Sequence, residues 1–429
     1  MPKGTIAVIG GTVWPGQRAD LIPDQTIVAV DGVITSVGPR ETETVPDSAR
    51  VIDATGRFVI PGLSDAHVHL TTNSDEDFYG SWPTFLNDRA LPEQTLHGVR
   101  NGIRALASGF TTLRVMGIRG AGEPQYRDFA AKGLLPGPRM LVAPWWISMT
   151  NGHGDLFYPT HHPRQEWDTA DGPDECRKLV RIISRAGADF IKVMASGGLL
   201  SSGDKASWPN YTVEELTAIV DEAHALDLKV AAHATGRSGI QRALEAGVDS
   251  IEHGIYMEEA EAQQMVEQGT WFVPTMAITD GFARPQLGLA PEHIAKTQGV
   301  ASRARDTFQM ALDMGVRIAA GTDGGDHIAA MGEHARELEI YTELGMDRVA
   351  ALETATINCA ELFGLQGQIG VLAPGACADI VVLEDNPIED IYALRRGRGI
   401  VNVIKDGTDY TGLLGRTFET EPLRVPPMD

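Results

Sequence analysis

The chain has 429 residues, and 36 Lys and Arg stand against 58 Asp and Glu, giving a formal net charge of −22. Such acidity repels nucleic-acid backbones and anionic membrane surfaces, so neither is expected as a partner. Hydrophobic residues make up 43% of the chain and charged residues 22%, as in ordinary globular proteins, and no apolar run reaches the roughly 18 residues of a membrane span. The N-terminus lacks a secretory apolar core, and three scattered cysteines form no disulfide framework. A cytoplasmic location is therefore expected.

Both ends of the chain are predicted to be β structure. Short β-branched runs occur at Thr5–Gly10, Thr26–Val30, Val33–Val37, Asp379–Leu383 and Ile400–Lys405. Asp31-Gly32 and Asp406-Gly407 are hairpin-type turns beside these runs. Because strands must pair to be stable, we predict one small β-sandwich domain made from residues 1–57 and 365–429 together.

Between these ends, residues 58–364 have a different pattern of apolar residues. Short apolar runs alternate with amphipathic stretches of helical period, such as Val213–Leu226, Gly239–Ala246 and Glu258–Gln268, which is typical of βα units around a parallel sheet. The eight runs are Phe58–Leu63, Thr111–Val115, Arg139–Ala143, Asp189–Met194, Lys229–Ala232, Ser250–Glu252, Trp271–Met276 and Arg317–Ala320. Eight parallel units close naturally into a barrel, so we predict an α/β fold with a (β/α)8 TIM barrel. An open doubly wound sheet would need a glycine-rich nucleotide loop after its first strand, and this chain has none.

Metal-competent side chains gather where the predicted strands end. Active sites of such barrels lie at the C-terminal ends of the strands. The residues at those positions are His67, His69, Lys192, His233, His253 and Asp323. His67 and His69 are two residues apart on an extended strand, so both imidazoles face the same side and can bind one ion. A single buried histidine is more often a hydrogen-bonded core residue, but five strand ends each supplying such a group indicate a metal site.

These residues resemble the amidohydrolase superfamily in their pattern, from Asp65-Ala66-His67-Val68-His69 to Gly321-Thr322-Asp323. Three segments are similar to its imidazolonepropionase-like branch, which includes Xaa-Pro and Xaa-Arg dipeptidases and ochratoxin-cleaving amidases. They are GADFIKVM at 187–194, AHATG at 232–236 and IEHG at 251–254. The resemblance covers nearly the whole chain, because that family also pairs a metal barrel with a β domain from both termini.

The resemblance implies a binuclear metal centre. His67, His69 and Asp323 would bind one divalent ion, and His233 and His253 the other. Lys192 would bridge the ions as a carboxylated (carbamylated) lysine, because a bare ammonium has three donors and no acceptor. Imidazole and carboxylate ligands suit zinc, while the ligand types leave cobalt, manganese and iron open. Two divalent metal ions, zinc first, and carboxylated Lys192 are therefore the expected cofactors.

The resemblance also implies how such a centre hydrolyses its substrate. Hydroxide bridging the metals would attack the carbonyl, and Asp323 would be catalytic by moving the proton to the leaving nitrogen. His153, in a glycine-flanked loop after strand three, would bind the substrate and polarise its carbonyl, unless it is a solvated loop histidine. Tyr256 would bind the substrate, unless it packs beneath its loop. Residues Met331–His334 depart from the His-Gly pair common in the family, so the role of this loop stays open.

The sequence thus predicts a hydrolase that cuts an amide or peptide bond in a small molecule, either a dipeptide or an N-acyl amino acid such as an ochratoxin-like compound. A carbamate, urea or lactam hydrolase with the same metal centre is the nearest alternative. Lys192 argues against a mononuclear deaminase, although Glu252 beside His253 keeps that alternative open. A non-catalytic barrel protein would have lost ligands, whereas this chain has all six. The resemblance leaves assembly into a homo-oligomer open.

Overall fold

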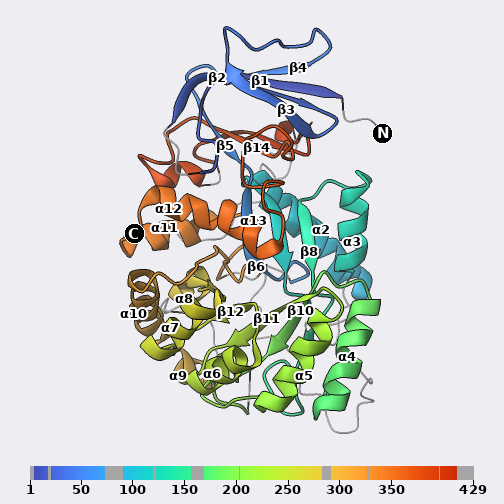
Figure 1. Cartoon of the computed structure of the whole chain (residues 1–429), viewed down its shortest axis with the longest axis vertical. Helices are drawn as coiled ribbons and strands as arrows, with labels where there is room; N and C mark the ends of the chain where they lie inside the picture. The colour runs from blue at the N-terminus through green and yellow to red at the C-terminus, as the bar shows by residue number, and fades with distance from the viewer. Residues whose placement is uncertain are drawn as a thin grey trace.

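The computed structural model describes residues 4–17, 21–72, 90–118, 122–155, 169–201, 203–282, 291–325, 328–395 and 397–412. Within these residues the chain has two parts (Figure 1). Strands from both ends of the sequence form a β-rich part, and the middle of the chain forms a larger α/β part beside it. This division into an end-built sheet and a central α/β unit confirms the predicted fold class.

The β-rich part is an eight-stranded sheet in the order β16-β15-β14-β5-β1-β2-β3, with β4 paired to β1. Its strands are β1 Thr5–Val13, β2 Ile22–Val30, β3 Val33–Pro39, β4 Arg50–Asp53, β5 Phe58–Pro61, β14 Ile380–Leu383, β15 Ile400–Lys405 and β16 Thr408–Asp409. The antiparallel pair β5 and β14 joins the two ends of the sequence. A bridge from Val33 to Cys377 brings β3 back beside the residues before β14, so the sheet curls around its own apolar core.

Both predicted hairpin turns have the backbone that their sequences favour. Asp31 and Gly32 have φ of 49° and 90°, and Asp406 and Gly407 have φ of 48° and 72°. Positive φ at both central residues belongs to the turn whose twist matches a two-residue hairpin, and the Asp-Gly pair favours it. These turns join β2 to β3 and β15 to β16.

The α/β part is a closed ring of parallel strands. They are β6 Leu63–Val68, β7 Phe110–Val115, β8 Arg139–Val142, β9 Trp146–Ile147, β10 Phe190–Met194, β11 Lys229–Ala234, β12 Ser250–His253 and β13 Trp271–Val273. The third barrel strand is divided, because β8 pairs with β7 whereas β9 pairs with β10. Residues 317–320 close the ring, since the Phe272 amide donates to Arg317 at 2.8 Å and the Ala66 amide donates to Ala320 at 2.8 Å.

The structure corrects the predicted bounds of three barrel strands. The run Phe58–Leu63 is not the first barrel strand, because β5 ends at Pro61 in the terminal sheet and β6 begins at Leu63. Apolar content alone does not tell two successive buried strands apart. The run Trp271–Met276 is a strand only to Val273, because α8 begins at Met276. Arg317–Ala320 forms an isolated bridge and single hydrogen bonds instead of a regular ladder.

Helices pack around the outside of this ring (Figure 1). Those described are α2 Leu91–Ala107, α3 Glu123–Ala131, α4 Pro173–Arg185, α5 Val213–His224, α6 Arg237–Ala246, α7 Glu259–Gln268, α8 Met276–Gly281, α9 Pro291–Thr297, α10 Val300–Asp313, α11 Ala335–Glu343, α12 Arg348–Thr354, α13 Ile357–Phe363 and the short 3₁₀ helix η1 Ile391–Leu394. Helices α5, α6 and α7 lie where the amphipathic pattern predicts them. Thr212 and Glu215 form a capping box at the start of α5, which is why that helix begins there.

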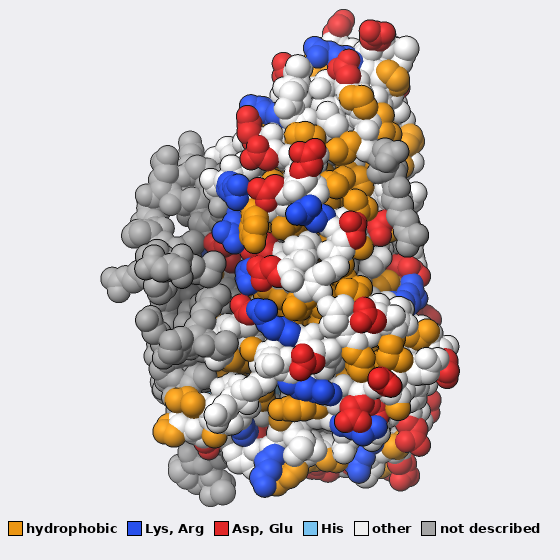
Figure 2. All heavy atoms as spheres, turned by 90° about the vertical axis from the view of Figure 1, so that its left-hand side faces the viewer, with side chains coloured by type: hydrophobic (Ala, Val, Ile, Leu, Met, Phe, Trp, Pro, Cys, Tyr) orange, Lys and Arg blue, Asp and Glu red, His pale blue; other side chains and the backbone are white. Residues whose placement is uncertain are grey.

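The visible face of the molecule carries charges of both signs. Figure 2 shows Asp and Glu interspersed with Lys and Arg over this face instead of gathered in one acidic patch.

Across the described segments, no helix combines the length and the apolar character that crossing a bilayer would require.

Candidate active site

The C-terminal ends of the barrel strands surround a cavity of about 90 Å³. All six predicted metal ligands and His153 line it, together with an apolar wall. The polar lining residues are His67, His69, His153, Lys192, His233, Thr235, His253, Thr279 and Asp323. Residues separated by more than 250 positions in the sequence therefore meet at one rim, as the barrel prediction requires.

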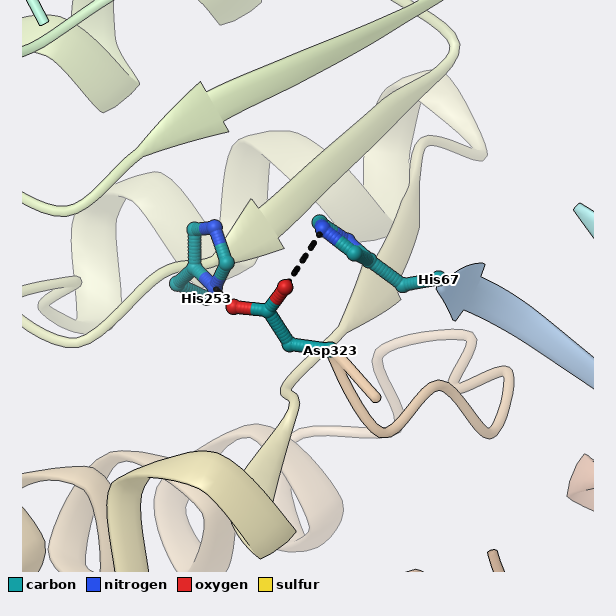
Figure 3. A group of neighbouring side chains, drawn as sticks. All are labelled: His67, His253 and Asp323. Carbon is teal, nitrogen blue, oxygen red and sulfur yellow. Dashed lines mark ion pairs between the residues drawn. The ribbon is translucent and has the colours of Figure 1, made fainter. Parts of the chain in front are cut away.

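Two histidines direct a ring nitrogen at the same oxygen of Asp323. Asp323 Oδ1 lies 3.4 Å from His67 Nε2 and 3.3 Å from His69 Nε2. Zinc bonds of about 2.0–2.2 Å arranged as a tetrahedron place neighbouring ligand atoms about 3.3–3.6 Å apart, so each of these two distances is one that ligands of a single ion would have. His253 lies on the other side of Asp323, and one ligand atom from each of His67, His253 and Asp323 lies within 4.8 Å of the others. Figure 3 shows the Asp323 carboxylate between the imidazole rings of His67 and His253.

The Nδ1 atoms of His67 and His69 are already occupied. His67 Nδ1 lies 2.8 Å from Glu252 Oε2, and His69 Nδ1 lies 2.8 Å from the Gly117 carbonyl oxygen. Both acceptors require a proton on Nδ1, which leaves the Nε2 lone pair for a metal. His253 differs, because its Nδ1 lies 2.8 Å from Thr275 Oγ1 and is also the ring nitrogen that lies 4.0 Å from Asp323 Oδ2.

Glu252 forms a buried ion pair beneath the cavity. Its Oε1 accepts from Arg114 Nη2 at 2.8 Å and from Ser250 Oγ at 2.5 Å. Burial by itself raises the pKa of Glu252, but the charge of Arg114 and the hydrogen bond from His67 outweigh burial and hold this pKa below its ordinary value. Glu252 does not line the cavity. Both its oxygens are engaged in holding His67 and Arg114, which disfavours the proton-transfer role that a deaminase would need.

Asp65 forms hydrogen bonds both within the first barrel strand and with the loop that carries Asp323. Its Oδ1 accepts from the His67 amide at 2.9 Å, and its Oδ2 accepts from Thr322 Oγ1 at 2.7 Å. His334 Nδ1 donates to the same Oδ2 at 2.7 Å, and its buried ring stacks on Phe110. The loop Met331–His334, whose role the sequence leaves open, thus supplies a structural histidine. No local motif could have paired residues 65 and 334, because they are distant in sequence.

Three residues at the strand ends adopt the left-handed backbone that non-glycine residues rarely use. The φ angles are 68° at His253, 50° at Thr275 and 56° at Asp323. Each such residue costs about 1 kcal/mol or more, and strain of this kind clusters at functional sites. The strain falls on two predicted metal ligands and on the threonine that orients one of them.

Lys192 is buried among these groups on β10 and is only 1% exposed. Burial disfavours the ammonium form and lowers the pKa of Lys192 to about 8, although Glu252 and Asp323 act against this shift. This burial does not fit a lysine whose ammonium reaches into solvent. The Lys192 amine can therefore lose its proton at a pH only slightly above neutral.

His233 and His153 form the other side of the cavity. Their rings stack with centroids 4.3 Å apart, and the His233 and His253 centroids are 4.6 Å apart. Burial lowers the pKa of His153 to about 4 and that of His233 well below its ordinary value. His153 is therefore part of the cavity instead of a solvated loop histidine.

Tyr256 lies outside this group. Its side chain is not among those lining the cavity, and the residue is 37% exposed. A substrate-binding role for Tyr256 stays a prediction. The lining residues that the sequence did not predict are two threonines, Thr235 and Thr279, and the apolar Met194, Leu199, Leu200, Ile255, Ile278 and Phe282. Several follow strand ends directly, so their positions relative to β10 and β12 were the available signal.

Comparison with known proteins agrees with this geometry. Residues 58–408 match the model of the amidohydrolase family. Ochratoxinase from Aspergillus niger is 32% identical over 433 residues, covering 94% of this chain and 86% of the relative. A solved Xaa-Pro dipeptidase with bound methionine is 31% identical, has a TM-score of 0.85, and is matched over 95% of this chain and 100% of the other.

Two further similarities mark the breadth of this group. The crystal structure of A. niger ochratoxinase has a TM-score of 0.83 at 30% identity over 95% of each chain. Imidazolonepropionase from Symbiobacterium thermophilum is 27% identical over 94% of this chain and 95% of its own length. The chain belongs to the amidohydrolase family and is a hydrolase that acts on C–N bonds.

Proposed function

We propose that this protein is a binuclear metal-dependent amidase or dipeptidase that cleaves a small amide, either a dipeptide or an N-acyl amino acid. The observation that carries the proposal is the set of three ligand atoms from His67, His69 and Asp323 at spacings of 3.3 and 3.4 Å. Similarity to an ochratoxinase and to Xaa-Pro dipeptidases supports an amide substrate.

The donor set fits two divalent ions, for which zinc is the first candidate. His67, His69 and Asp323 would hold one ion, and His233 and His253 the other. Lys192 would bridge them after carboxylation, in which its neutral amine nitrogen attacks carbon dioxide and releases one proton. This reaction turns a neutral amine into an anion with two oxygens. Burial favours it, because it lowers the pKa of the amine to about 8.

When bound, two such ions would lower the pKa of water and polarise the scissile carbonyl. Asp323 is the proton carrier in this proposal, because its carboxylate faces the centre of the ligand group and can accept a proton and give it to the leaving nitrogen. His153 contacts the substrate across the cavity from Asp323. The apolar wall formed by Leu199, Ile278 and Phe282 would exclude water and take up an apolar portion of the substrate.

From its composition and its resemblance to the family, we propose that the protein acts on a small molecule and works in the cytoplasm. Its assembly into a homo-oligomer stays open. The net charge of −22 disfavours binding to a nucleic-acid backbone.

A substrate panel tests the proposal. Purified protein loaded with zinc would be given N-acyl amino acids with apolar side chains, dipeptides including Xaa-Pro, aryl carbamates, aryl ureas and lactams. We expect the highest kcat/KM for an N-acyl amino acid or dipeptide, and no ammonia release from aminopurines. A carbamate, urea or lactam as the best substrate would overturn the amide assignment and leave the metal centre intact, whereas deamination would overturn both.

A further inference from the structure

A buried chain of polar groups runs away from the cavity behind His153. His153 Nδ1 lies 2.9 Å from Ser201 Oγ, and Ser201 Oγ donates to Asp204 Oδ2 at 2.6 Å. Asp204 Oδ1 in turn accepts from Lys296 Nζ on α9 at 2.5 Å. None of Ser201, Asp204 and Lys296 lines the cavity, so they reach the substrate only through residues that do, which are His153 and the loop residues Leu199 and Leu200.

Asp204 is the centre of this chain. Its side chain is 2% exposed and also accepts from the Gly198 amide at 2.9 Å. A buried charge needs paired hydrogen-bond donors, and Lys296 with Ser201 and Gly198 supplies them. Lys296 additionally donates to the Ser201 carbonyl at 2.5 Å, so α9 and the loop after β10 are tied together at the residue that touches His153.

The protons available in this series of hydrogen bonds determine which group donates and which accepts at each contact. A carboxylate only accepts, and a serine hydroxyl has a single proton to donate. Burial raises the pKa of Asp204, but hydrogen bonds from Lys296 and Ser201 bring it below its ordinary value, so the carboxylate is ionised. The Ser201 proton is therefore directed to Asp204. At the remaining contact His153 must donate from Nδ1 and Ser201 Oγ must accept.

The ring of His153 is also packed by two neighbours. His233 stacks on it with an interplanar angle of 29°. On the loop that carries Ser201, a Cβ added to Gly198 would lie 2.2 Å from His153 Cε1. The glycine backbone therefore packs directly against the imidazole, and any side chain at residue 198 would collide with the ring.

We propose that Asp204 is a positioning residue for His153 that acts through Ser201 and is anchored by Lys296, so that the ring keeps a proton on Nδ1 and its orientation at the edge of the cavity is fixed. This inference rests on the proposed amidase function for its kinetic consequence but not for the tautomer itself.

The tautomer is tested by two-bond ¹H–¹⁵N spectra of the zinc-loaded protein labelled with ¹⁵N-histidine, with His153 assigned by its loss in His153→Gln. We expect the ring of His153 to carry a proton on Nδ1. In Ser201→Ala and Asp204→Asn this preference should weaken. The first variant removes the acceptor, and the amide introduced by the second can donate to Ser201 and free the hydroxyl proton for the ring. A native ring with no proton on Nδ1, or unchanged spectra in both variants, would overturn the proposal.

Kinetics with the best secondary amide from the panel give a second test. Ser201→Ala and Asp204→Asn should each lower kcat by about 10-fold to 100-fold, as expected when a reacting geometry loosens. Ser201→Thr should keep the native activity because it keeps the hydroxyl. Asp249→Asn is the matched control, since Asp249 contacts His224 at 2.9 Å away from the cavity.

The outcomes separate the two proposals. If Asp204→Asn behaves like Asp249→Asn and Ser201→Thr is as impaired as Ser201→Ala, the positioning role is wrong. If the protein hydrolyses no amide, the proposed function is wrong, and the spectra still decide the role of Asp204.

Discussion

The two ends of the barrel use buried charges in opposite ways. At the strand starts, Arg139 pairs with Asp379 and Asp406, both at 2.5 Å, and links the barrel to the terminal sheet. At the strand ends, Asp323 Oδ1 lies 3.4 Å from His67 Nε2 and 3.3 Å from His69 Nε2, and Asp323 has a strained backbone. At the strand starts, each charge is paired with an opposite charge of the same chain. At the strand ends, potential metal ligands are brought together and backbone strain is stored, which is typical of a site that a bound group stabilises.

The largest expected effect is at the bridging position of the rim. Lys192→Ala should remove the only residue proposed to serve both ions, so metal and activity should be lost together, with kcat/KM falling more than about 100-fold. Elemental analysis and turnover of the same preparation measure this. Full activity in the variant would remove Lys192 from the centre.

The residues beneath the rim should show a smaller effect. Glu252→Gln keeps the shape but leaves Arg114 without its charge partner and weakens the hold on His67 Nδ1. Metal affinity should fall about 10–100-fold, the range for partners of metal-binding histidines. Competition with a chelator measures it. An unchanged affinity would mean that Glu252 serves only stability.

A substitution at the strand starts of the barrel should lower stability without changing metal binding. Arg139→Met removes the partner of Asp379, which is 2% exposed, and should lower the free energy of unfolding by about 3 kcal/mol. Metal affinity should stay as in the native protein. Denaturant unfolding and the chelator competition together make the comparison, and a large loss of metal affinity would show that the two ends are coupled.

A buried acid near the rim gives the most pH-dependent effect. Burial raises the pKa of Glu123 to about 8 although Thr71 donates to it at 3.0 Å. An acid whose pKa is raised on folding stabilises the fold below its unfolded value of about 4.5, and this contribution is lost as the pH rises through 8. Glu123→Gln should therefore gain stability relative to the native protein at pH 8 and not at pH 4.5. Thermal unfolding at both pH values checks this, and an equal effect at both would contradict the shifted pKa.

Sequence patterns predicted the barrel and predicted that the six candidate ligands would meet at its rim, because strand ends of a parallel barrel meet whatever their separation in the chain. They did not predict the partners that orient those residues. Glu252 with Arg114, and Asp65 with His334, are long-range pairs between residues that carry no local motif. The break between β5 and β6 was missed for a related reason. Both strands are buried and apolar, and only their pairing partners distinguish them.

The central claim is that the rim binds two ions, and metal stoichiometry tests it most directly. Protein purified without chelators and equilibrated with zinc and bicarbonate would be measured by elemental analysis against amino-acid analysis. The proposed centre predicts about two ions per chain. A reproducible value near one would contradict the binuclear centre, and a value near zero would contradict a metal site altogether.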